Sequence, residues 1–242
     1  MRDFHNQQLQ RLRVPAALLA LLSLSHCATS PPPRESKPPA VVTAPTTPAA
    51  ATQNYQIDME RSLLQILVYR GGKLAALGHN HVVASHDLTG SLMRTDPLSG
   101  TRFDMRLPVA SLTVDEPELR RQAGEDFQAE VPQNARDGTR RNLLSDAVLD
   151  AEHFADIRLR AVDAEDLQNG RFDVGVDIEI KGRIRRLRVP VQLQVAANEL
   201  SASGELTVLQ SDLGLTPFTA LLGALTVENQ MRVRFRVVAK ER

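Results

Sequence analysis

The chain has 242 residues, of which 29 are basic and 29 are acidic, so its formal net charge is zero. This balance and the lack of a basic block argue against a nucleic-acid partner, because phosphate binding needs concentrated Lys and Arg. Aromatic residues make up only 4% of the chain, and Trp is absent. An aliphatic core of this kind suits hydrocarbon chains better than bases or sugars, which favour aromatic platforms.

The first 27 residues have the pattern of a bacterial export signal. Arg2, Arg11 and Arg13 precede a short apolar run at residues 14–24. A positively charged segment followed by an apolar segment too short to span a membrane is typical of a secretory signal peptide. Residues 1–27 are therefore predicted to direct export to the periplasm.

Cys27 is the only cysteine, so no disulfide can form within one chain. It directly follows Leu24-Ser25-His26, and this order resembles the lipidation box of bacterial lipoproteins. His26 departs from that pattern, which usually has Gly, Ala or Ser before the Cys, and ordinary secretion with cleavage nearby is the alternative. Ala28 follows, without the Asp of an inner-membrane retention signal. We expect lipidation of Cys27 and an anchor in the outer membrane.

The segment after Cys27 is of low complexity. Residues 28–53 consist largely of Pro, Ala, Thr and Ser. Such a composition predicts a disordered, semi-extended tether. The folded domain is then expected to cover residues 54–242.

Period-two alternation of apolar residues dominates this domain and predicts strands. The expected strands cover residues 55–69, 74–84, 87–95, 103–107, 109–114, 157–161, 172–180, 187–195, 200–209 and 231–239. Many strands separated by turns favour an all-β sandwich or barrel.

Two or three short helices are expected among the strands. One begins near Glu116-Pro117 and ends at Gly124, because Pro favours a first helical turn and Gly a helix end. A second lies within residues 134–149. A third, apolar helix is predicted at residues 217–222, where Thr216 precedes Pro217.

The longest alternating pattern runs from Phe172 to Val195 and predicts an antiparallel hairpin with one apolar face. About eight such strands can close into a barrel that holds one ligand. The alternation alone fits a packed sandwich equally well. Pro190 lies on the outward face of the second strand, where its missing N–H requires a bulge or broken pairing.

Four motifs resemble the YceI-like family. They are Tyr55-x-Ile57-Asp58, Leu143-Leu144-Ser145-x-x-x-Leu149-Asp150-x-x-x-Phe154, Ile178-x-Ile180-x-Gly182 and Leu187-x-Val189-Pro190-Val191. The resemblance implies an antiparallel, lipocalin-like closed barrel of about eight strands, exported to the periplasm, with an elongated pore for an isoprenoid or another acyl lipid. The Pro-rich tether and Gly78-His79-Asn80-His81 depart from the family pattern and leave the ligand's identity open.

With this reading, two sets of apolar residues become candidates for ligand contact. The predicted pore lining comprises Phe172, Val174, Val176, Ile178, Val189, Val191, Leu193, Val233 and Phe235. The predicted lid over the ligand entrance comprises Phe218, Leu221 and Leu222, because Pro217 and Gly223 bracket a segment that could move. A core helix that closes one barrel end is the alternative for this segment.

His79 and His81 are the sharpest polar feature, because residues two apart on a strand share one face and two imidazoles can share a metal. A metal- or haem-associated redox protein is therefore one alternative function, and a packed structural module without ligand is another. No nucleophile elbow, phosphate loop or dinucleotide motif is present, so no enzymatic activity and no cofactor are predicted. The oligomeric state is open, and a homodimer is one of the states allowed.

Overall fold

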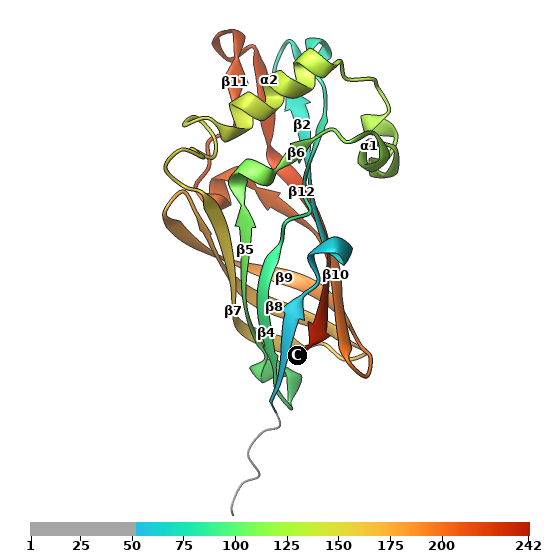
Figure 1. Cartoon of the computed structure of the whole chain (residues 1–242). Coiled ribbons are helices and arrows are strands. Elements are labelled where there is room, and N and C mark those ends of the chain that lie inside the picture. Colours follow the sequence, from blue (N-terminus) through green and yellow to red (C-terminus); the bar gives the residue numbers. More distant parts are fainter. Residues whose placement is uncertain (1–51) are drawn as a thin grey trace, which may run out of the picture. The chain divides into compact units, whose positions relative to one another are not determined.

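The computed structural model describes residues 52–242. The predicted signal peptide, the lipidation site at Cys27 and almost all of the predicted tether lie outside these residues. Figure 1 shows the described domain, in which strands form the wall of a barrel and helices lie at one end and one side. The strands are β1 (Gln53–Ile57), β2 (Leu63–Gly71), β3 (His81–Ser85), β4 (Thr89–Arg94), β5 (Arg102–Pro108), β6 (Thr113–Val114), β7 (Asp156–Asp166), β8 (Arg171–Ile180), β9 (Arg183–Val195), β10 (Glu199–Leu209), β11 (Thr219–Ala220) and β12 (Leu225–Glu241).

These strands form a closed antiparallel barrel with eight strand positions around its wall, as predicted. The pairing order runs β1, β4, β5, β7, β8, β9, β10 and β12, and β12 pairs with β1 to close the ring. Strands β2, β3 and β6 extend strands of this ring and do not widen it. Strand β2 pairs with β12 and β3, as β1 does with β12 and β4. At three of the eight positions, two strands separated by a kink follow one another along the barrel wall. These are β1 with β2, β4 with β3, and β5 with β6.

The kink between β1 and β2 has a visible cause. A 3-10 turn, η1 (Met59–Arg61), interrupts the strand. The hydroxyl of Ser62 accepts a hydrogen bond from Val238 N at 3.0 Å and donates to Asp58 O at 2.7 Å. Because a buried backbone N–H without a partner is costly, this side chain replaces the ladder bond that the kink removes.

The predicted central hairpin is confirmed as β8 and β9. Ile180 pairs with Arg183, which leaves Lys181 and Gly182 as a two-residue turn, and both have positive φ (48° and 69°). A two-residue loop with two positive φ values is the turn that matches strand twist. The register pairs Phe172 with Val191 and Val174 with Val189 on one face.

The expected break at Pro190 is also present. Strand β9 pairs with β10 only from Gln192 to Val195, opposite Ser203 to Leu200. The ladder stops two residues before Pro190, which cannot donate a backbone hydrogen bond. Toward their other ends β9 and β10 are not paired with each other, although β9 stays paired with β8 and β10 with β12, so the wall is least continuous between these two strands.

Two of the three predicted helices are confirmed. Helix α1 covers Pro117–Ala123, with Gly124 at its C-terminal cap. Helix α2 covers Gln133–Leu144 and ends earlier than the predicted limit, because Ser145 is extended and residues 146–149 form a turn. Helix α2 lies across the upper end of the barrel, and α1 lies beside it (Figure 1).

The third predicted helix, at residues 217–222, is wrong. This segment contains β11 and the 3-10 turn η7 (Leu221–Gly223) instead. Thr219 and Ala220 pair with the start of β12, and Val227 N donates to Phe218 O at 2.9 Å. The ladder therefore satisfies backbone groups that a helix would have bonded internally. Leu221 and Leu222 have positive φ (51° and 56°), which a right-handed helix excludes.

Two predicted strands are shorter than expected. In the segment 74–84 the strand begins only at His81, because η2 (Ala75–Leu77) precedes it. In the segment 109–114, η4 (Val109–Ser111) leaves only β6 as strand. The remaining 3-10 turns are η3 (Leu98–Gly100), η5 (Glu125–Phe127) and η6 (Gln210–Leu213). No helix in residues 52–242 has the length and apolarity to cross a membrane.

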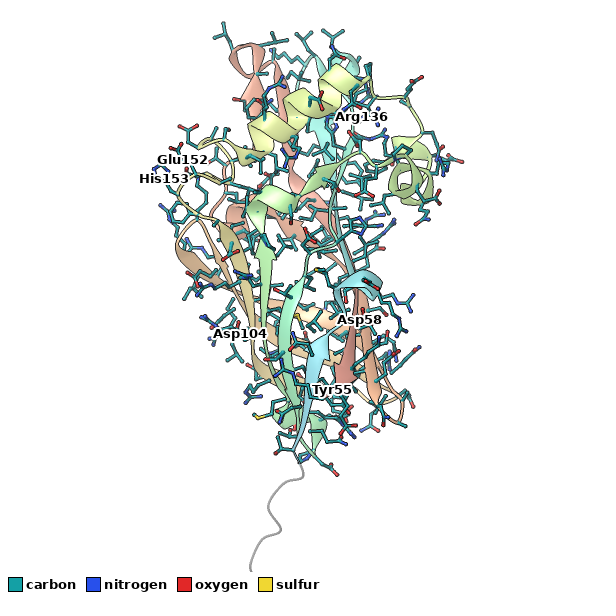
Figure 2. The ribbon with its side chains drawn as sticks, viewed as in Figure 1. Tyr55, Asp58, Asp104, Arg136, Glu152 and His153 are labelled. Atoms are coloured by element: carbon teal, nitrogen blue, oxygen red, sulfur yellow. The ribbon has the colours of Figure 1, made fainter. Side chains whose placement is uncertain are left out.

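The core lies on the inner face of the barrel. Tyr55 is 0% exposed and belongs to the main hydrophobic cluster. Asp58 follows it at the start of the kink and pairs with Lys240 at 2.7 Å (Figure 2). A second cluster under α1 contains Leu67, Val82, Leu119 and Phe127.

Candidate lipid cavity

The barrel encloses an apolar cavity of about 310 Å³. This volume lies at the lower end of the range of small-molecule sites, about 300–1,000 Å³. Thr101 and Gln210 are the polar residues of a lining that otherwise consists of Leu, Val, Ile, Ala, Phe and Met. The barrel is thus hollow and not packed through its centre, the point that alternation alone left open.

All nine predicted pore residues lie in this lining. Phe172, Val174, Val176 and Ile178 come from β8, Val189, Val191 and Leu193 from β9, and Val233 and Phe235 from β12. Phe172, Val174 and Val176 also form a buried cluster against β9. The structure brings these residues around one space, and their contact with a ligand stays a prediction.

The part of the lining contributed by the other strands was not identified from the sequence. It includes Leu64, Ile66, Leu92, Phe103, Met105 and Leu159, from β2, β4, β5 and β7. These strands alternate over fewer residues, since kinks and a bulge after Ala161 interrupt them. Apolar residues at every second position were nevertheless visible in two of these strands. They are Phe103, Met105 and Leu107, and Ile157, Leu159 and Ala161.

The predicted lid residues are separated by the structure. Phe218 is partly buried and packs against the main cluster. Leu221 and Leu222 lie at the tip of the β11–β12 hairpin, with Leu222 fully exposed at 109% of its reference area. None of the three lines the apolar cavity, so the structure does not place them as a cover over it.

A second cavity of about 250 Å³ adjoins the first at the end covered by α2. Val68, Val83, Leu143, Val148 and Gln210 line both cavities. The rest of the second lining is more polar and includes Arg70, His79, His81, Thr139, Asn142 and Thr226. Phe218, from the predicted lid, also belongs to it.

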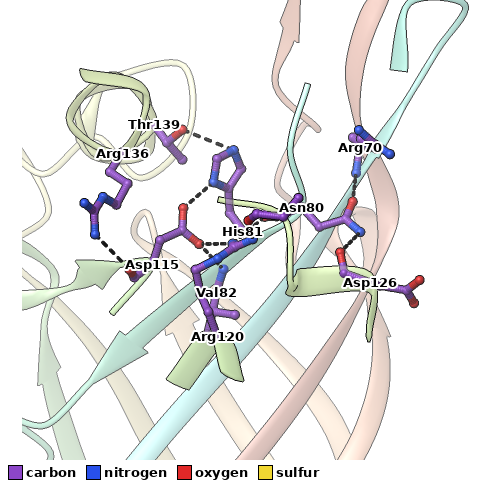
Figure 3. Close-up of polar contacts among 10 residues, drawn as sticks. Arg70, Asn80, His81, Val82, Asp115, Arg120, Asp126, Arg136 and Thr139 are labelled. Atoms are coloured by element: carbon purple, nitrogen blue, oxygen red, sulfur yellow. Dashed lines mark hydrogen bonds and ion pairs between the residues drawn. The ribbon is translucent and has the colours of Figure 1, made fainter. Parts of the chain in front are cut away.

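Beside this second cavity lies a buried polar network around Asp115 (Figure 3). Its Oδ1 accepts hydrogen bonds from Val82 N at 2.9 Å and from Arg120 Nη1 at 2.6 Å, and its Oδ2 lies 2.6 Å from His81 Nδ1. Burial alone would raise the pKa of the Asp115 carboxyl. The hydrogen bonds from His81, Val82 and Arg120 outweigh this effect and hold its pKa below the usual value.

The network determines how His81 is presented. An ionised carboxylate can only accept, so Nδ1 of His81 donates to Asp115. In the neutral imidazole, Nε2 then accepts from the Thr139 hydroxyl, 3.3 Å away on α2. His81 therefore joins β3 to α2, and its role in this network is structural.

His79 lies immediately before β3, with its ring centroid 6.1 Å from that of His81. Its side chain makes no hydrogen bond or ion pair with any residue from 52 to 242. Burial, and then the nearby charges of His81 and Arg120, lower its pKa. We expect a neutral imidazole here at neutral pH.

The geometry gives no complete ligand set for the metal hypothesis. In the described part of the chain, no three His, Cys, Asp or Glu side chains are grouped so that they could hold a metal ion. His86 pairs with Glu116 at 2.9 Å, and His153 pairs with Asp150 at 2.7 Å on the loop after α2 (Figure 2). Neither provides a third ligand beside His79 and His81.

Comparisons with known proteins identify a family and a shared fold. The family model described as the YceI-like domain matches residues 55–239. The fold is similar to that of BcnA from Burkholderia cenocepacia (TM-score 0.56, 13% identity, 76% of this chain and 99% of that chain). It is also similar to a polyisoprenoid binding domain from Saccharophagus degradans (TM-score 0.53, 13% identity, 78% and 98%). No curated protein matches the sequence. The family model covers most of the chain, which therefore belongs to the YceI-like domain family.

Proposed function

We propose that the protein binds the apolar chain of an isoprenoid or another acyl lipid inside the barrel, as a carrier or sequestering protein and not as an enzyme. The observation that carries this proposal is the cavity lined almost wholly by aliphatic and Phe side chains. Family membership supports it, and so does the similarity of the fold to the polyisoprenoid binding domain from Saccharophagus degradans.

The energetics of such binding rest on burial of methylene groups. Each buried CH₂ contributes about 0.8 kcal/mol. Roughly ten of them would supply a dissociation constant in the micromolar range before the entropic cost of association. The lining offers almost no hydrogen-bonding groups, so it would select length and flexibility in the chain and not a particular polar group.

For the cellular setting, we propose a periplasmic protein anchored to the outer membrane through Cys27. The positively charged and apolar segments before Cys27 support export, and the order Leu24-Ser25-His26-Cys27 supports lipidation. Membrane fractionation of the wild type and the Cys27→Ala variant tests the anchor. Equal release of both into the soluble periplasmic fraction would contradict it.

Native mass spectrometry of the purified protein tests the ligand proposal. A bound lipid should appear as an added mass that organic extraction removes and that an offered isoprenoid restores. A chain that carries no added mass and takes up neither isoprenoids nor fatty acids would overturn the proposal.

A further inference from the structure

The second cavity adjoins the apolar cavity and carries more polar side chains in its lining. The two spaces share Val68, Val83, Leu143, Val148 and Gln210. A molecule whose tail fills the barrel therefore has one end beside these shared residues. The chemistry of the second lining then indicates what that end carries.

Most polar groups around the second cavity are uncharged hydrogen-bonding groups. They are the hydroxyls of Thr139 and Thr226, the amides of Asn142 and Gln210, and the imidazole of His79. Gln210 is only 6% exposed, and its Nε2 donates to Glu228 O at 2.7 Å. Its carbonyl oxygen, with no partner among residues 52–242, remains available as an acceptor.

Of the charged groups nearby, Arg70 is the one without a carboxylate partner among the described residues. Arg70 Nη1 donates to Gly78 O at 2.7 Å. The carboxylate of Asp115 is balanced by Arg120 and bonded to His81. A charged headgroup would therefore meet a single exposed guanidinium and would lose much of its hydration, which is costly for an ion. A hydroxyl or carbonyl would lose far less.

His79 is the side chain best suited to contact such a group. It lines the second cavity, and its ring nitrogens have no partner among the described residues. A neutral imidazole offers one donor and one acceptor, which match a hydroxyl or a carbonyl oxygen. Apolar sites commonly use a few polar groups in this manner to orient a ligand.

We propose that the second cavity binds the uncharged polar headgroup, a hydroxyl or a carbonyl, of the lipid whose tail occupies the barrel, and that His79 is its main hydrogen-bonding partner. This inference rests on the proposed function, since it requires a tail in the apolar cavity. It also gives His79 and His81 different roles, His79 toward the ligand and His81 in the network with Asp115.

Three probes with one tail test the proposal on the full chain. They are geranylgeraniol, geranylgeranyl phosphate and the hydrocarbon that lacks the hydroxyl, each assayed by displacement of a fluorescent lipid. We expect geranylgeraniol to bind about fivefold more tightly than the hydrocarbon, the effect of one neutral hydrogen bond. His79→Leu should remove this preference without weakening hydrocarbon binding. His86→Leu, a matched change outside both cavities, should preserve it.

A second measurement reports on the site directly. The imidazole nitrogen resonances of His79 should shift when geranylgeraniol is added and not when the hydrocarbon is added. Equal affinity for the alcohol and the hydrocarbon, or tighter binding of the phosphate, would overturn the headgroup inference and leave the proposed function intact. Failure of all three probes to bind would overturn the headgroup inference, and failure of fatty acids as well would overturn the proposed function.

Discussion

His81 and Asp115 form a buried pair, with Nδ1 of the imidazole 2.6 Å from Oδ2 of the carboxylate. Asp115 is 1% exposed and has a positive φ of 57°, a conformation that few residues other than Gly adopt. The carboxylate also accepts from Arg120 on α1. One side chain therefore holds together β3, the segment that leaves β6, and α1.

Replacing the carboxylate should show how much this network contributes to the free energy of unfolding. Asp115→Asn leaves the buried Arg120 guanidinium without its counter-charge. Breaking a buried pair in this way costs about 3–5 kcal/mol. We expect a loss of this size in the free energy of unfolding, measured by urea denaturation. Asp137→Asn, an exposed change on α2, should have little effect. A loss for Asp115→Asn no larger than for Asp137→Asn would contradict the prediction.

The same carboxylate predicts a dependence of stability on pH. Because the pKa of Asp115 is lowered from 3.8 in the folded protein, its contribution is fully present above that usual value and is lost as the pH falls through the lower folded value. The difference in unfolding free energy between wild type and Asp115→Asn should be constant from pH 7 to about pH 5 and shrink at more acidic pH. Denaturation series at several pH values measure it, and a difference that stays constant to pH 2.5 would refute it.

Two glycines should respond to alanine in opposite directions. A Cβ on Gly204 of β10 would lie 2.3 Å from the carbonyl oxygen of Pro190 and 2.6 Å from Cζ of Phe235. Gly204→Ala should destabilise the protein by about 1–3 kcal/mol, as overpacking does. A Cβ on Gly138, within α2, would meet only a distant atom of Arg141. Gly138→Ala should stabilise by about 0.5–1 kcal/mol.

Thermal and urea denaturation of both variants measure these effects. Both variants replace Gly with Ala and so change the conformational entropy of the unfolded chain alike. The difference between their free energies of unfolding therefore reports local packing. A neutral Gly204→Ala would show that β9 and β10 move apart easily at Pro190. That outcome would contradict the close approach seen between these strands.

The sequence predicted the strands because their signal is local, whereas the closed barrel followed from the resemblance to the YceI-like family. Alternation from Phe172 to Val195, the Lys181-Gly182 turn and the break at Pro190 each depend on neighbouring residues, and all three are present. The helix expected at residues 217–222 failed because pairing with β12, a long-range interaction, outweighed local preference. Kinked strands shortened the other signals, so the part of the lining contributed by β2, β4, β5 and β7 was missed.

The polar network was beyond sequence reasoning for a different reason. Asp115, Arg120 and His81 are brought together only by the turn after β6 and the docking of α1. Spacing indicated that His79 and His81 could share a face. It could not show that His81 hydrogen-bonds to a carboxylate 34 positions away, which leaves His79 as the imidazole of the second cavity with no hydrogen-bond partner among the described residues.

Filling part of the barrel should weaken lipid binding without unfolding the protein. Ala202 of β10 lines the cavity and pairs with Leu193 and Val237, which line it too. The ring introduced by Ala202→Phe would occupy part of the space that a lipid tail needs. If two methylenes lose their contacts, at about 0.8 kcal/mol each, affinity should fall by about tenfold.

The matched control is the neighbouring residue on the opposite face. Ser203 pairs with Gln192 and Arg236 and does not line the cavity. Because successive residues of a strand point to opposite faces, Ser203→Phe adds the same ring outside the barrel. It should leave lipid affinity, measured by displacement of a fluorescent lipid, unchanged. Equal affinities for the two variants would mean that the bound tail lies outside the cavity, whereas a loss confined to Ala202→Phe places it within.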